Sequence, residues 1–258
     1  GLPDDAVKES HERIASALDH NGLRLPHKQT IINMAPADIK KEGSAYDLPI
    51  AIGMLAANGV VNADEIGKYI IMGELSLDGT LRPIKGVLPI AIKAREEKFK
   101  GIILPKENSR EAAIVNDVEV YGVENIKEVV GFLNGETTLE QTVVNTREEF
   151  FNSLNHFDLD FSDVKGQENV KRAIEVAAAG GHNIIMVGPP GAGKSMMAKR
   201  VPTILPPMTL NEALETTKIH SVAGSMKGDA SLLNVRPFRS PHHTISDVAL
   251  VGGGSYPQ

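Results

Sequence analysis

Cysteine and tryptophan are absent from this 258-residue chain, and aromatic residues make up only 4% of it. Without cysteine, the chain forms neither disulfide bonds nor a thiolate zinc site. No apolar run approaches the roughly 20 residues that a membrane span needs, and no signal peptide is recognisable at Gly1. These absences predict a cytoplasmic protein with no membrane segment.

A strong charge of either sign is also missing. The net charge is −6, of which residues 1–150 carry −7 and residues 151–258 carry +1. No segment is basic enough to hold nucleic acid through its charge alone.

The most informative motif that is present is a phosphate loop. It runs Gly188-Pro189-Pro190-Gly191-Ala192-Gly193-Lys194-Ser195 and fits the pattern G-x-x-x-x-G-K-[ST] throughout. The preceding run 183–187 is typical of a buried parallel strand, and residues 196–201 can continue as a helix. The glycines let backbone N–H groups approach phosphate oxygens, while Lys194 would reach the β- and γ-phosphates and Ser195 would bind Mg²⁺. The motif therefore predicts an ATP and Mg²⁺ site rather than an ordinary glycine turn.

The acidic residue that such an ATPase needs is not found after this loop. That residue follows a second apolar strand and holds Mg²⁺, whereas Asp247 comes before its apolar run and Gly252-Gly253-Gly254 ends that run. The chain also starts at Gly1 and stops at Gln258. We therefore expect a fragment of a longer protein, one that binds nucleotide without efficient turnover and whose catalytic residues are unknown.

The pattern of apolar residues indicates two α/β domains. We expect the first domain over residues 1–150, with a polar linker from residue 134, and the second over residues 151–258. Asp78-Gly79 is a hairpin signal. In the first domain the periodicity predicts helices over 6–20, 47–58, 87–98 and 126–133, and strands over 30–32, 69–75 and 102–104. In the second it predicts a helix over 168–179.

Long stretches of the chain resemble the magnesium-chelatase-like AAA+ ATPases of the ComM/YifB type. They are DFSDVKGQENVKRAIEVAAAGGHNIIMVGPPGAGKS, TILPPMTLNEALETTKIHSVAG and RPFRSPHHTISDVALVGGG in the second half, and LPDDAVKESHERIASAL and APADIKKEGSAYDLPIAIGMLAANGVV in the first. The resemblance implies that Val164 and Gly166 lie beside the adenine. It also implies a homo-oligomeric ring, a hexamer, that couples ATP hydrolysis to DNA remodelling as a branch-migration helicase in transformation and recombination.

The first half is further similar to the proteolytic domain of Lon-type proteases, through GELSLDGTLRPIKGVLPIAIKAREEKFKGIILPKEN. The resemblance implies a Lon-protease-like α+β domain followed by a truncated P-loop (AAA+) parallel-sheet domain. Lon-type peptidases use a Ser nucleophile and a Lys base, but these positions fall on Asp47 and Leu88. Ser44 and Lys85 are a less favoured, displaced pair. We expect Asp47 to cap the helix over 47–58 and the domain to be inactive as a peptidase.

Several alternatives remain open. The magnesium-chelatase ATPase subunit shares the AAA+ module, so a metal-insertion motor is a second functional class; it is weaker because the Lon-like N-terminal domain is not part of that subunit. An ATP-dependent protease is a disfavoured third class. His220, His242 and His243 are a weak candidate for a metal site, because no Cys or acidic cluster accompanies them. The loop over residues 236–243 either touches DNA through its two arginines and Phe238 or packs against a neighbouring subunit.

Overall fold

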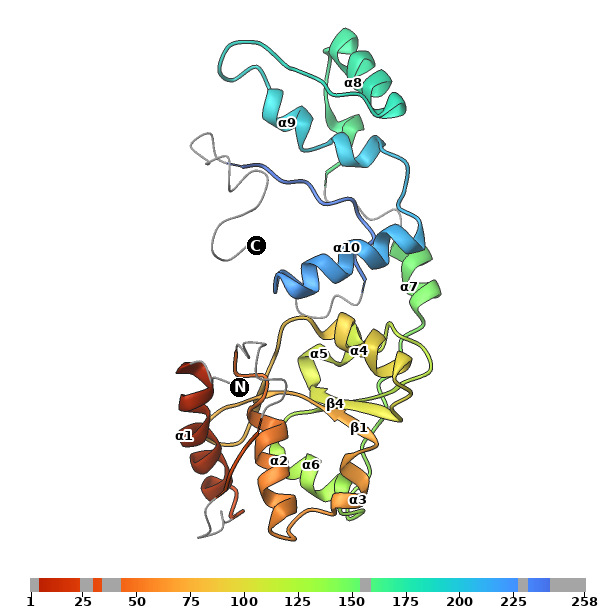
Figure 1. Cartoon of the computed structure of the whole chain (residues 1–258). Coiled ribbons are helices and arrows are strands. Elements are labelled where there is room, and N and C mark those ends of the chain that lie inside the picture. The colour runs from red at the N-terminus through yellow and green to blue at the C-terminus, as the bar shows by residue number, and fades with distance from the viewer. Residues whose placement is uncertain (1–4, 24–29, 34–42, 154–158, 227–231, 242–258) are drawn as a thin grey trace. The chain divides into compact units, whose positions relative to one another are not determined.

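The structure is a computed structural model, and it describes residues 5–23, 30–33, 43–153, 159–226 and 232–241 (Figure 1). The described residues belong to two units. The first lies within Gly1–Thr146 and Thr217–Ser231, and the second within Arg147–Thr216 and Leu232–Gln258. Among the helices described, none combines the length and the apolar character that crossing a bilayer requires.

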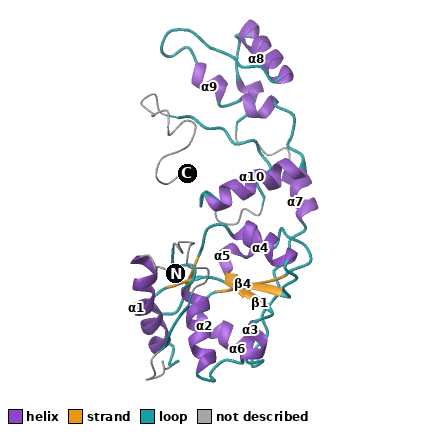
Figure 2. Ribbon diagram, viewed as in Figure 1, coloured by secondary structure: helices purple, strands orange, loops and turns teal. Residues whose placement is uncertain are grey.

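Helices surround short strands in the first unit (Figure 2). In chain order its elements are α1 (Asp5–His20), α2 (Asp47–Ala57), α3 (Ala63–Ile66), β1 (Tyr69–Ile71), β2 (Glu74–Leu75), β3 (Leu81–Arg82), α4 (Val87–Glu96), β4 (Gly101–Pro105), α5 (Lys106–Ala112), β5 (Glu119–Val123) and α6 (Ile126–Leu133). The described part of the second unit contains helices but no strand: α7 (Thr146–Ser153), η1 (Phe161–Asp163), α8 (Glu168–Gly180), α9 (Lys194–Ala198), η2 (Val201–Ile204) and the start of α10 (Leu210–Val222).

A three-stranded parallel sheet organises the first unit. Its strand order is β1-β4-β5, and every residue of the central strand β4 is buried. Ile103 packs in one core cluster with residues of α1, α2 and α6. Because side chains alternate along a strand, Ile102 and Leu104 point to the opposite face, and α4 and α5 both contact β4. The sheet therefore sits between two layers of helices.

The sequence pattern located most elements of this unit. The helices expected over 6–20, 47–58, 87–98 and 126–133, the strand over 102–104 and the hairpin around Asp78-Gly79 are all confirmed. The strand expected at Thr30-Ile31-Ile32 was wrong, because these residues have no strand partner among those that the structure describes and Ile31 is 85% exposed. The short elements α5 and β5 were not foreseen.

Part of α10 completes the first unit. The first N–H groups of a helix have no partner within that helix, and at α4 two of them bond to Ser221. The Gly86 N–H donates to the Ser221 carbonyl at 3.0 Å, and the Leu88 N–H donates to the Ser221 hydroxyl at 3.4 Å. The Leu88 N–H also donates to the Glu111 carboxylate at 3.0 Å. Residues far apart in sequence therefore close this end of α4.

The second unit has two small apolar clusters in its described part. One joins Phe161, Val164, Ile174 and Met197, and the other joins Phe150, Met208 and Ala213. The buried strand expected over residues 183–187 was wrong: Ile185 is 87% exposed and Val187 is 90% exposed, and the segment is irregular. A strand needs hydrogen bonds to a neighbouring strand, and the described residues of this unit supply none.

Candidate functional site

The phosphate loop ends at α9, and its backbone has the shape that the glycines predict. Gly191 and Gly193 have φ of 81° and 82°, in the left-handed region that favours glycine. The Lys194 ammonium group folds back over the loop. It donates hydrogen bonds to the carbonyls of Gly188 and Pro189, both at 2.7 Å. Lys194 therefore sits on the loop itself rather than pointing away from it.

The residues present fit a bound triphosphate with Mg²⁺. The Lys194 ammonium has three N–H donors and uses two of them on loop carbonyls. Gly191 is required by its backbone angle rather than by space, because a Cβ there would meet no atom within 4 Å. Ser195, the expected Mg²⁺ ligand, is exposed on the first turn of α9. A cation and an accessible hydroxyl thus adjoin a loop whose backbone angles only glycine adopts readily.

Val164 and Gly166 lie on the segment that precedes α8. Val164 is 3% exposed and shares a core cluster with Met197 of α9, so the structure brings this segment and the phosphate-loop helix together. Gly166 is exposed, with φ of 64°, and the next residue, Gln167, also has positive φ. The chain turns sharply at these two residues and then begins α8.

Sequence reasoning missed a polar clamp built on Arg200. Its guanidinium group donates to the carbonyls of Asp160, at 3.0 Å, and Met196, at 3.2 Å, and forms an ion pair with the Asp163 carboxylate at 3.3 Å. Hydrogen bonds from Ser162 lower the pKa of Asp160, and the charge of Arg200 lowers that pKa further. The Asp-x-x-Asp spacing of a capping box was the available signal for the turn. Nothing local indicated that Arg200 would reach it.

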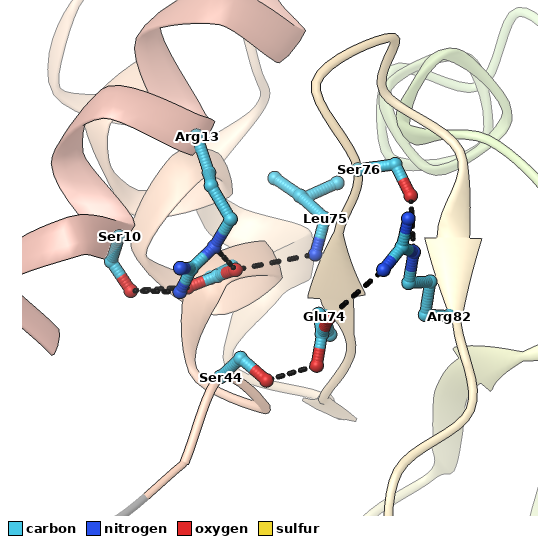
Figure 3. A network of polar contacts seen from close by, with 8 residues as sticks. Ser10, Arg13, Ser44, Glu74, Leu75, Ser76 and Arg82 are labelled. Carbon is cyan, nitrogen blue, oxygen red and sulfur yellow. Dashed lines mark hydrogen bonds and ion pairs between the residues drawn. The ribbon is translucent and has the colours of Figure 1, made fainter. Parts of the chain in front are cut away.

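The expectation that Asp47 caps α2 was wrong. Tyr46 occupies the cap position, and Asp47 is the first helical residue. Its side chain is fully buried and accepts hydrogen bonds from Ser10, from Arg13 and from the Leu75 N–H (Figure 3). The Arg13 Nε atom lies 2.9 Å from one carboxylate oxygen. A buried carboxylate needs a partner charge and hydrogen bonds, and α1 supplies both. Asp47 therefore joins α1 and α2 to the hairpin.

The displaced peptidase pair is not assembled. The Ser44 hydroxyl donates to the Glu74 carboxylate (Figure 3). Lys85 is exposed and lies beside Gly224, where a Cβ would come within 2.5 Å of the Lys85 Cε atom. Leu88, at the expected Lys position, is fully buried.

The remaining candidates give no metal site within the described part of the chain, where no group of three His, Cys, Asp or Glu residues lies close enough to hold an ion. His220 is in the last turn of α10. Arg236 bonds to the Pro206 carbonyl at 2.9 Å and to the Glu212 carboxylate at 3.4 Å. Three residues weighed from sequence lie outside the described part: His242, His243 and Asp247.

Comparison with known proteins matches both halves. Residues 160–258 match the family model of magnesium chelatase, subunit ChlI, and residues 1–108 match that of subunit ChlI of Mg-chelatase. Competence protein ComM of Haemophilus influenzae is 41% identical across 100% of this chain and 50% of its own length. Uncharacterized protein YifB of Escherichia coli is 41% identical across 100% of this chain and 49% of its own. Lon protease 2 of Bacillus subtilis is 27% identical over 48% of this chain and 22% of its own. The chain spans about half the length of the two more similar relatives.

Proposed function

We propose that this chain, which belongs to the magnesium-chelatase-like AAA+ family of the ComM/YifB type, binds ATP and Mg²⁺ at residues 188–195. The observation that carries the proposal is the placement of Lys194, whose ammonium group sits on the glycine-rich loop with one N–H donor beyond the two already bonded. Val164 and Gly166 would then flank the base.

Each part of the loop has a defined task in this proposal. Backbone N–H groups and Lys194 bind phosphate oxygens, and the Ser195 hydroxyl is a ligand for Mg²⁺. When bound, the metal ion neutralises charge that develops on the phosphates. Acids that orient an attacking water molecule are not assigned, so we keep the prediction that these 258 residues turn nucleotide over slowly.

Calorimetry with Lys194→Ala tests the assignment. We expect the variant to lose most of its affinity for Mg²⁺-ATP, because the loop loses its cation. Lys199→Ala is a matched control, since Lys199 is exposed and lies one residue beyond α9. Near-normal affinity in Lys194→Ala would contradict the proposal. An equal loss of affinity in both variants would mean that net charge, rather than the loop, determines binding.

For the whole protein we propose a ring-forming motor, with a hexamer as the expected assembly, that couples ATP hydrolysis to DNA remodelling by branch migration. Support comes from the name of one relative, competence protein ComM, and from its 41% identity across all of this chain. The test is the ATPase rate of the uncut protein with and without forked DNA. A rate that DNA leaves unchanged would contradict this role.

A metal-insertion motor is the second candidate, because both matched family models carry the name of a chelatase subunit. It predicts that a porphyrin with its partner subunits, rather than DNA, stimulates the ATPase. Peptidase activity has less support. The nucleophile position is occupied by Asp47, whose side chain is fully buried, and the displaced candidate Ser44 bonds to Glu74. Casein cleavage that Ser44→Ala abolishes would reverse that judgement.

A further inference from the structure

Arg200 joins two segments, each of which adjoins one end of the proposed nucleotide site. One is α9, where its Nη1 atom donates to the Met196 carbonyl at 3.2 Å. The other is the turn at Asp160 and Asp163, some 40 residues earlier in the chain, which receives the Nε and Nη2 donors. The side chain is only 14% exposed. The guanidinium is a planar fork of five donors, so it can hold several acceptors in fixed directions at once.

The turn that Arg200 holds also has hydrogen bonds of its own. Its capping box is complete: Asp160 accepts from the Ser162 N–H at 2.7 Å, and Asp163 accepts from the Asp160 N–H at 3.1 Å. Thr203 adds a second connection, because its hydroxyl accepts from the Phe161 N–H at 3.1 Å and donates to the Arg200 carbonyl at 2.8 Å. Arg200 and Thr203 therefore hold the turn from the same side.

This turn leads directly to residues 164–166, which would flank the base of the nucleotide and are called the base-side segment below. Val164 follows η1 and is buried against Met197, while Gly166 and Gln167 redirect the chain into α8. The segment is thus held by the Arg200 clamp before it and by α8 after it. Within the part of the chain that the structure describes, no hydrogen bond joins Val164 or Gly166 to the phosphate loop itself. The separation of the two depends on Arg200, on the Thr203 hydroxyl and on one small apolar cluster.

We propose that Arg200 is a positioning residue that sets the distance between the base-side segment and the phosphate loop. The inference rests on the proposed function. A ligand that carries both a base and phosphates must meet both segments at once, so it binds well only when their separation is fixed. A ligand made of phosphates alone needs only the loop. Loss of Arg200 therefore weakens the first ligand and spares the second.

The test compares two probes, Mg²⁺-ATP and inorganic tripolyphosphate, by calorimetry on the full chain. We expect Arg200→Ala to weaken ATP binding about tenfold and to change tripolyphosphate binding by less than about twofold, a tenfold change being about 1.4 kcal/mol. Arg200→Lys should be intermediate, because a single ammonium cannot replace the fork of donors. Asp163→Asn, which removes the ion pair and keeps an acceptor, should shift ATP binding in the same direction by a smaller factor.

Matched controls separate the possible failures. Lys199→Ala changes an exposed neighbouring cation and should leave both affinities unchanged, whereas Lys194→Ala should weaken both. Wild-type protein that binds neither probe would overturn the proposed function. Wild-type protein that binds both, with Arg200→Ala unchanged for ATP or weakened equally for both probes, would overturn this inference alone. Hydrogen exchange gives a second readout: faster exchange in Arg200→Ala should be confined to residues 160–166.

Discussion

The two units differ in whether their apolar β-branched segments pair with neighbouring strands within the described chain. In the first unit, β4 is bonded to a parallel strand on each side and buried along its whole length. In the second unit, the apolar run 183–187 has no paired neighbour, and Val187 is 90% exposed. Both runs are rich in β-branched residues, so composition does not explain the difference. Whether an apolar run forms a buried strand therefore depends on the sheet around it rather than on its own residues alone.

The same contrast holds for polar groups. Asp47 in the first unit is fully buried and bonded on several sides, whereas Lys194 in the second bonds, among the described residues, to carbonyls of its own loop alone. Binding residues are often carried on loops that a rigid scaffold positions. The first unit therefore holds a fully buried, bonded carboxylate, and the second carries the candidate site on a loop.

Removing the Arg13 charge should give the largest loss of stability. Arg13→Ala leaves the fully buried Asp47 carboxylate without its ion-pair partner, and breaking a buried pair in this way costs about 3–5 kcal/mol. Urea unfolding followed through hydrogen exchange at β4 measures the loss. The control is Arg82→Ala, which removes an exposed partner of Glu74 and should cost no more than about 1 kcal/mol. Equal losses in the two variants would contradict the burial argument.

A pair of matched isoleucine substitutions tests the contrast between β4 and residues 183–187 directly. Ile103→Ala removes a fully buried side chain and should cost about 2–5 kcal/mol. Ile185→Ala changes a side chain that is 87% exposed and should stay within about 0.5 kcal/mol. Free energies of unfolding from urea titrations give both values. A large loss from Ile185→Ala would mean that residues 183–187 are buried in solution.

The sequence could predict those features that depend on residues nearby in the chain, and it could not predict those that depend on distant residues. Helices over 47–58 and 126–133 and the turn at Asp78-Gly79 depend on nearby residues, and the structure has all of them. The left-handed angles of Gly191 and Gly193 follow from the motif. The role of Asp47 was missed because its partners are distant in sequence: Ser10 and Arg13 lie more than thirty residues upstream on α1, and Leu75 lies downstream on β2. Arg200 was missed for the same reason.

Helix caps are local, so the same change should have the same effect in both units. Asn125 caps α6 in a capping box with Glu128, and Thr209 and Glu212 form the corresponding pair at the start of α10. Asn125→Ala and Thr209→Ala should each cost about 1 kcal/mol. Hydrogen exchange along each helix measures the two losses. A difference between them of more than about twofold would show that the unit, rather than the cap, decides the effect.

The last expected effect is an alkaline pH dependence of the first unit, which appears only above about pH 10. Burial and the hydrogen bond to Glu119 raise the pKa of Tyr121 to about 12. An unfolded tyrosine has a pKa of about 10, so the folded chain holds this proton more tightly. The stabilising contribution is therefore complete below about pH 10, and it is lost as the pH rises from there through about 12. Tyrosinate absorbance should show Tyr121 ionising only at strongly alkaline pH, and Tyr121→Phe should remove this part of the pH dependence. If the unfolding free energy of wild type and variant falls in parallel between pH 10 and 12, Tyr121 is not its source.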